Sequence, residues 1–314
     1  MTDKQINKWL RRRFSQVGWV LIGYYCLMNL LVMLEVLVDE LRWMLEGFLD
    51  PNGAADFFPE NAWGYIATLF TGLLILHAWK GPDYWRGEVL VRVSKMRPGV
   101  LACLLCFSVG AQMVNSVWVM GLETVLNLFG LSAMAVLETV SGASDTFSMF
   151  LYASVLGPIS EEILFRGYVL RSLRPFGKRF AILGSAVLFG LFHGNLLQAP
   201  YAFMLGLLLG YVTVEYSIGW AVLIHVFNNL VLADLLTRLT AGWSDMAYSA
   251  LNLVLLGGCF LLSLGILIRK RSAVREYRSG EWMDRRCLKC FFTSPGILFM
   301  AAAMCISMVM LFFA

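Results

Sequence analysis

Charged residues are scarce in this 314-residue chain: Asp, Glu, Lys and Arg make up 15% of it, against roughly 25% in ordinary soluble domains. This scarcity argues against a globular protein of the cytosol. The seven cysteines are too few for a small disulfide-rich scaffold, and a mean hydropathy of +0.70 is too apolar for a disordered chain. The net charge of +4 is small, so we expect no nucleic-acid partner.

Hydrophobic residues, in contrast, make up 59% of the chain. A helix needs about 20 mostly apolar residues to cross about 30 Å of hydrocarbon, so this length has room for about eight or nine spans. We therefore expect an all-α protein, a polytopic transmembrane helix bundle. The expected spans are the apolar blocks at residues 16–38, 63–79, 100–122, 145–173, 180–197, 200–216, 220–236, 246–268 and 295–314.

The polar residues divide this bundle into three segments. Residues 1–144 are expected to hold N-terminal transmembrane helices and, at 123–140, an amphipathic interfacial segment bracketed by Glu123 and Glu138. Residues 145–236 form the expected helical core, which holds most of the ionisable residues found inside spans. Residues 237–314 are expected to add C-terminal transmembrane helices and a basic cytoplasmic loop.

The distribution of Lys and Arg predicts the orientation, because short cytoplasmic loops hold the excess of positive charge. The N-terminal segment and the stretches 171–179 and 269–289 are basic, whereas the loop after the first span is acidic. We therefore expect an integral membrane protein with a cytoplasmic N-terminus. No A-x-A-like cleavage site follows the first apolar block, so we read that block as an anchor.

Ionisable side chains inside spans are costly, so they are functional candidates by default. In this chain they gather in the segment 145–236. Outside this group we assign Glu35 and His77 to packing or interfacial roles, and Glu215 to a helix end. The candidates within the segment are Glu161, Glu162, Arg166, His193, His225 and the pair Asn228 and Asn229.

Helical spacing sorts these candidates. Glu162 and Arg166 are four residues apart and can form an ion pair, which leaves the Glu161 carboxylate available. His225 and Asn229 have the same spacing. Counting residues from the basic stretch 171–179, which is expected on the cytoplasmic side, puts Glu161 and His193 at a similar depth of about 20 Å. We therefore expect that they can meet. By the same count His225 and Asn229 are shallower, and their contact with Glu161 stays open.

Three motifs in this segment resemble those of a known family. Residues 161–166 fit E-E-x-x-x-R, residues 189–193 fit F-x-x-x-H, and residues 225–229 fit H-x-x-x-N. They look like the motifs of the CPBP family, which comprises CAAX prenyl endopeptidases, bacteriocin-processing enzymes and abortive-infection-like membrane proteins. The resemblance covers about residues 145–236 and implies an intramembrane endopeptidase. It also leads us to expect a location in a bacterial cell membrane.

Other protease signatures are absent from the sequence, which lacks H-E-x-x-H, G-x-S-x-G and G-x-G-D. Water therefore remains as the nucleophile. A carboxylate among apolar helices is a better base towards water, which makes Glu161 the candidate base. His193 is expected to share the proton transfer or to orient the water, and His225 and Asn229 to hydrogen-bond the oxyanion. The resemblance implies the same roles, with Glu162 and Arg166 in support.

Two alternatives stay open. In the first, the two histidines and Glu161 bind Zn²⁺, which activates the water; our primary expectation is no metal and no cofactor. The lone C-x-x-C at Cys287 and Cys290 does not make a zinc site. In the second, the chain is a non-catalytic immunity or scaffold protein that keeps the motifs. The expected partners are membrane lipid and a membrane-associated peptide or protein substrate.

Overall fold

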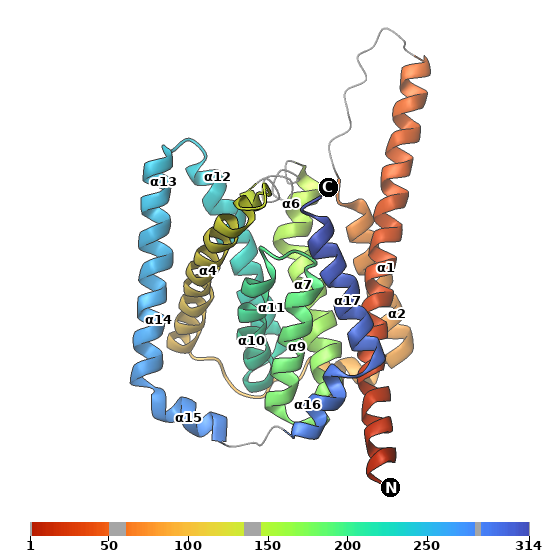
Figure 1. The fold of residues 1–314 in the computed structure, drawn as a ribbon, viewed down its shortest axis with the longest axis vertical. Coiled ribbons are helices and arrows are strands. Elements are labelled where there is room, and N and C mark those ends of the chain that lie inside the picture. Colours follow the sequence, from red (N-terminus) through yellow and green to blue (C-terminus); the bar gives the residue numbers. More distant parts are fainter. Residues whose placement is uncertain (1, 50–60, 135–145, 280–283, 314) are drawn as a thin grey trace.

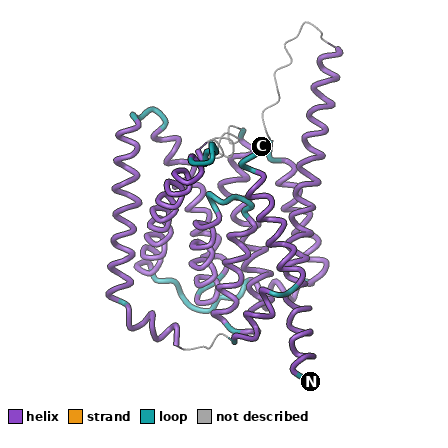
Figure 2. The backbone as a smooth tube through the Cα atoms, viewed as in Figure 1, coloured by secondary structure: helices purple, strands orange, loops and turns teal. Residues whose placement is uncertain are grey.

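The structure is a computed structural model that describes residues 2–49, 61–134, 146–279 and 284–313. Within these ranges every regular element is a helix and no strand occurs (Figure 2). The all-α class expected from the sequence is confirmed. Several helices contain π-helical segments, in which the backbone hydrogen bond reaches one residue further than in an α-helix.

The helices stand side by side in one bundle (Figure 1). A central group is flanked by α1, α2 and α17 on one side and by α4, α13 and α14 on the other. The flanking and connecting elements are α1 (Asp3–Leu49), α2 (Trp63–Lys80), α3 (Pro82–Tyr84), η1 (Trp85–Val89), α4 (Pro98–Asn127), α13 (Asp245–Asn252), η6 (Leu253–Gly257), α14 (Gly258–Arg269), α15 (Arg271–Ser279), α16 (Arg285–Phe292) and α17 (Pro295–Met310).

The central group carries the polar motifs. Its first part is an unbroken helical stretch from residue 147 to residue 176, in which α and π segments alternate. The elements in chain order are α6 (Phe147–Leu151), η2 (Tyr152–Leu156), α7 (Gly157–Glu162), η3 (Ile163–Val169), α8 (Leu170–Leu173), η4 (Arg174–Phe176), α9 (Lys178–Phe192), α10 (Ala199–Glu215), α11 (Ile218–Val226), η5 (Phe227–Leu235) and α12 (Leu236–Thr240).

Helix α1 has 47 residues and is about 70 Å long at 1.5 Å per residue, far more than a bilayer's hydrocarbon requires. Its C-terminal end extends beyond the rest of the bundle (Figure 1). Its N-terminal half crosses α17 at two glycines. A Cβ on Gly18 would lie 2.3 Å from the carbonyl carbon of Gly296, and one on Gly296 would lie 2.2 Å from the Ser15 oxygen. The two helices therefore touch backbone to backbone, as small residues permit in membranes.

Glu35 in α1 has a role that the sequence did not indicate. Its carboxylate accepts hydrogen bonds from the backbone N–H groups of Trp63 at 3.0 Å and Gly64 at 2.7 Å. These are free donors at the start of α2, and a negative charge at a helix N-terminus is favourable. Glu35 therefore caps α2 from a neighbouring helix.

The expected amphipathic segment at 123–140 begins differently from the prediction. Glu123 belongs to α4, which continues to Asn127, and a turn follows. The Glu123 carboxylate accepts from the backbone N–H groups of Ala133 at 2.6 Å and Met134 at 3.1 Å. Residues 135–140 lie outside the described residues, so the amphipathic helix stays a prediction there.

Helices α9 and α10 pack closely through glycines. A Cβ on Gly190 would lie 2.9 Å from the Ala199 carbonyl oxygen, and one on Gly206 would lie 3.0 Å from the Ala186 Cα. The glycines of these two helices thus allow a close helix contact. Gly194, however, follows the end of α9 and has a φ of +58°, so it belongs to the turn that leaves the helix.

Glu215 at the end of α10 ties three elements together. It forms an ion pair with Lys178 at the start of α9, and the Tyr277 hydroxyl of α15 donates to it at 3.0 Å. The basic stretches 171–179 and 269–289 therefore contact each other at one end of the bundle. This contact agrees with their expected location on a single side of the membrane.

The described residues include four helices that are long and apolar enough to span a membrane, or up to five if one bent pair counts as a span. The helices that meet this criterion are Asp3–Glu46, Pro98–Asn127, Ile218–Thr240 and Asp245–Arg269; the pair α16 and α17 bends by 56°. The chain is thus an integral membrane protein by its helices. The count of eight or nine spans, the division into three segments and the cytoplasmic N-terminus stay predictions.

Candidate active site

The two neighbouring glutamates lie where α7 meets a π segment. Segments η2 and η3 flank α7 on its two sides, and a third π segment, η5, begins two residues after His225. Such segments are frequent at functional sites, because the extra residue redirects the side chains that follow. Sequence periodicity assumes 3.6 residues per turn and contains no signal for them.

Glu162 and Arg166 form the ion pair that their spacing predicts. Arg166 Nη1 lies 3.0 Å from Glu162 Oε1, and both side chains are fully buried. The guanidinium also donates from Nη2 to the Gly206 carbonyl at 3.3 Å and lies 4.3 Å from the centre of the Phe189 ring. A buried charge that loses its partner is strongly unfavourable, so this pair is a fixed element of the site.

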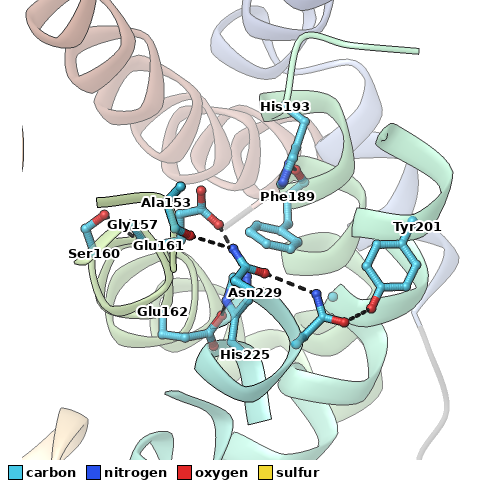
Figure 3. Close-up of polar contacts among 12 residues, drawn as sticks. Ala153, Gly157, Ser160, Glu161, Glu162, Phe189, His193, Tyr201, His225 and Asn229 are labelled. Carbon is cyan, nitrogen blue, oxygen red and sulfur yellow. Dashed lines mark hydrogen bonds and ion pairs between the residues drawn. The ribbon is translucent and has the colours of Figure 1, made fainter. Parts of the chain in front are cut away.

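His225 bridges the two glutamates (Figure 3). Its Nδ1 lies 2.9 Å from Glu162 Oε1, and its Nε2 lies 3.7 Å from Glu161 Oε2. A carboxylate engaged by Arg166 only accepts hydrogen bonds, so Nδ1 carries a proton and donates to Glu162. The Nε2 atom consequently faces Glu161.

Glu161 differs from Glu162 in its access to the surroundings. The Glu161 side chain is 31% exposed, whereas the Glu162 side chain is 0% exposed. One carboxylate is therefore neutralised in the interior and the other is reachable, as the spacing predicts.

The Asn229 amide has a defined orientation. Its Nδ2 donates to the Ala153 carbonyl oxygen at 3.0 Å, and its Oδ1 accepts from Asn228 Nδ2 at 3.1 Å. Because a backbone carbonyl only accepts, the amino group of Asn229 must face Ala153, and this assigns both amides. The second N–H of Asn229 remains for another acceptor.

Asn228 continues this chain of hydrogen bonds to two other helices. Its Oδ1 accepts from Gln112 Nε2 of α4 at 3.0 Å and from the Tyr201 hydroxyl of α10. Sequence reasoning named Asn228 but missed Gln112 and Tyr201. Their polar side chains in apolar spans were the only available signal.

His193 is placed differently from the expectation. Its Nδ1 donates to the Phe189 carbonyl at 2.8 Å, and within the described part of the chain it forms no hydrogen bond or ion pair with Glu161. The Phe189 ring lies between the two imidazoles, with centroids 4.8 Å from His193 and 5.8 Å from His225 (Figure 3). The histidine beside Glu161 is thus His225.

The zinc alternative requires three ligands in one place. In the ranges that the structure describes, no group of three His, Cys, Asp or Glu side chains could hold a metal ion. Glu161 and His225 approach each other, but His193 turns its Nδ1 to a backbone carbonyl. The described arrangement therefore does not fit a zinc site made of these residues.

One comparison with known proteins matches this part of the chain. Residues 143–231 match the family model described as Type II CAAX prenyl endopeptidase Rce1-like, a peptidase family. All the motif residues from Glu161 to Asn229 lie inside the matched range, which confirms the resemblance to the CPBP family. No curated protein and no solved structure matches the chain.

Proposed function

With an endopeptidase family assigned to residues 143–231, we propose that the chain is an intramembrane endopeptidase acting on a membrane-associated peptide or protein. One observation carries the proposal. A reachable carboxylate, Glu161, lies 3.7 Å from an imidazole that a fully buried ion pair holds in place. A base beside a fixed proton donor is what amide hydrolysis by water requires.

The chemistry follows from these positions. Glu161 takes a proton from water while the water oxygen bonds to the carbonyl carbon of the substrate. The oxyanion that forms accepts hydrogen bonds from the Nε2–H of a protonated His225 and from the second N–H of Asn229. When the carbon–nitrogen bond breaks, Glu161 returns the proton to the leaving nitrogen. Water has then been added across one peptide bond.

His193 takes a supporting part in this proposal. Its Nδ1–H is used by the Phe189 carbonyl, so a neutral ring presents Nε2 as an acceptor. An acceptor there can hold the water through one of its protons. Glu162 and Arg166 act through His225, since Glu162 fixes the proton of Nδ1.

An apolar cavity that reaches Ser160, the residue before Glu161, supports a substrate that resides in the membrane. The cavity has a volume of about 420 Å³ and is lined by Tyr24 of α1, Trp79 of α2 and Ser160, next to Glu161. Its lining is mainly aliphatic and aromatic. We propose that lipid and a membrane-embedded substrate are the partners, with no nucleic acid, in a bacterial cell membrane and with the N-terminus in the cytoplasm.

The test of this function is comparative peptidomics of membranes that contain the wild type or Glu161→Gln. Peptides whose new termini appear only with the wild type identify both the substrate and the cleaved bond. An identical set of peptides from the two membranes would contradict the proposal. The Glu→Gln change keeps the side-chain shape, so the comparison isolates the base.

We further propose that Asn228 positions Asn229. Asn228→Asp keeps the oxygen that Gln112 and Tyr201 use but removes the N–H that Asn229 Oδ1 accepts. The Asn229 amide then turns over and loses its donor to the oxyanion. We expect kcat to fall about tenfold to a hundredfold with KM nearly unchanged, since one oxyanion donor is worth about 10²–10³ in kcat.

The control for this change is Tyr201→Phe, which removes a donor to Asn228 Oδ1 and leaves the Asn228 N–H in place. Its kcat should stay within about threefold of the wild type. Steady-state kinetics on the peptide found by peptidomics measure both variants. Equal losses of kcat would show that Asn228 acts through packing only.

Metal removal provides a separate check. Because the described site does not assemble three ligands, we expect cleavage to continue unchanged in strong chelator. The measurement is the cleavage rate before and after chelation, together with the metal content of the purified protein. Complete loss of cleavage that added zinc restores would establish the zinc-dependent alternative.

A further inference from the structure

A second, larger cavity lies at the end of the bundle where basic residues gather. Its volume is about 1070 Å³, larger than the roughly 300–1,000 Å³ of ordinary small-molecule pockets. The residues around it come from η1, the following segment at 90–96, α7, η3 and the start of α11. We propose that this cavity binds the headgroup and upper acyl chains of an anionic phospholipid.

The charge of the cavity supports an anionic ligand. Arg92 and Lys95 line it, and among the described residues around it none is acidic. Both cations are exposed, and neither forms an ion pair within the described ranges. Glu215, the acidic residue whose backbone contacts this segment, has its carboxylate engaged by Lys178.

The segment that carries the two cations has a fixed position. The backbone N–H of Val93 donates to the Tyr216 carbonyl at 2.8 Å, and the Ser94 hydroxyl donates to the Glu215 carbonyl. These bonds hold the segment against the end of α10. Arg92 and Lys95 are thus presented together at the rim, and not on an untethered loop.

The remaining walls of the cavity are apolar and aromatic, as expected for a site that binds an amphiphilic molecule. Ile159 and Ile163 of the central stretch and Leu223 of α11 supply apolar surface, and Trp85 and Trp220 also line the cavity. Tryptophan favours the boundary between headgroups and acyl chains. Basic pockets between transmembrane helices are known to bind acidic lipid headgroups, whereas a soluble anion would gain nothing from the apolar wall.

The occupant is distinct from the peptide that is cleaved. At about 100° per residue, Glu161 points about 200° away from Ile159 on the same helix. The cavity therefore lies on the face of α7 opposite Glu161, and Ile163 forms the wall that it shares with the apolar cavity beside Ser160. A lipid seated there contacts the helix that carries Glu161 without entering the reaction.

The test uses the purified full-length protein and native mass spectrometry of retained lipid, with phosphatidylglycerol and phosphatidylcholine of identical acyl chains. We expect the wild type to retain phosphatidylglycerol preferentially. In Arg92→Gln/Lys95→Gln the affinity for phosphatidylglycerol should fall about tenfold to thirtyfold. Each cation near an anionic membrane surface raises the affinity about fivefold, and the variant removes two cations. Binding of phosphatidylcholine should not change.

A matched control is Arg269→Gln/Arg271→Gln, which removes two charges from the neighbouring basic stretch but none from the cavity. It should retain phosphatidylglycerol as the wild type does. Equal losses in the two double variants would overturn the proposal, because they would indicate diffuse attraction to a basic face.

A third variant, Gly219→Phe, fills the cavity without a change of charge. A Cβ at Gly219 meets only the Ser217 hydroxyl, at 3.8 Å, so a side chain at this position starts without a clash. Retention of both lipids should fall, and undiminished retention would overturn the proposal. Displacement of the bound lipid by a soluble peptide with a free C-terminal carboxylate would also overturn it and assign the cavity to a peptide end. These readouts do not depend on protease activity.

Discussion

Replacing Glu161 with Gln is expected to lower the cleavage rate about 10²–10⁴-fold while the protein remains folded. Glutamine keeps the shape of the side chain but cannot take a proton from water. The Glu161 side chain is 31% exposed, and its contact with His225 among the described residues is 3.7 Å long, so the change leaves the buried cluster intact. Single-turnover cleavage of the peptide identified in membranes gives the rate, and thermal unfolding checks the fold.

The control is Glu215→Gln, the same substitution at the ion pair with Lys178, away from the proposed base. It should cleave at nearly the wild-type rate. If Glu161→Gln retained full cleavage, Glu161 would not be the base. If neither the wild type nor Glu161→Gln cleaved any peptide, and cells that carry either protein had the same phenotype, the non-catalytic immunity or scaffold alternative would be established.

Removing one partner of the buried ion pair is expected to destabilise the protein by about 3–5 kcal/mol. Glu162→Leu leaves the Arg166 guanidinium uncompensated among apolar side chains, where both partners are fully buried. It also removes the acceptor of His225 Nδ1. The loss in the free energy of unfolding is measured in detergent, by following the helix signal as the temperature or the denaturant concentration rises.

Two further variants separate stability from chemistry. Glu162→Leu/Arg166→Leu replaces the pair by apolar side chains and should recover most of the stability, since such exchanges are often neutral. Its cleavage should stay low, because His225 is no longer held. The control Glu46→Gln breaks the ion pair between Arg42 and Glu46, which has the same four-residue spacing and the same 3.0 Å distance but lies at exposed positions of α1. It should not measurably change the free energy of unfolding. A double variant with full activity would show that the pair serves stability alone.

The site could be predicted from the sequence where a single helix determines the geometry. The spacing of Glu162 and Arg166 gave their ion pair, and the same reasoning left Glu161 available. Composition likewise predicted the all-α class. These inferences need only the period of a helix and the cost of a charge in hydrocarbon.

The contacts between helices were not predictable in the same way. Residue counting favoured His193 over His225 as the neighbour of Glu161, because it assumed straight helices with a uniform rise. In the structure π segments η2 and η3 flank α7, the helix that carries Glu161. A π segment rotates the side chains before it relative to those after it, and it has no sequence signature.

The hydrogen bonds to Asn228 could not be predicted from the sequence for a different reason. Gln112 and Tyr201 stand in two helices that are far from Asn228 and from each other along the chain. A single sequence gives no pairing information across such separations. Similarly, the capping of α2 by Glu35 depends on how α1 and α2 lie side by side.

The crossing of α1 and α17 has a consequence for biogenesis. Its glycines permit backbone contact only when both helices are present, and the nearby hydrogen bond between the Tyr25 and Ser307 hydroxyls joins residues 282 positions apart. During synthesis from the N-terminal side, α1 must wait in the membrane while the intervening helices arrive. The contact between α1 and α17 thus forms only after α17 has been synthesised. A nascent chain stalled before α17 would expose the glycine face of α1 to other proteins in the same membrane.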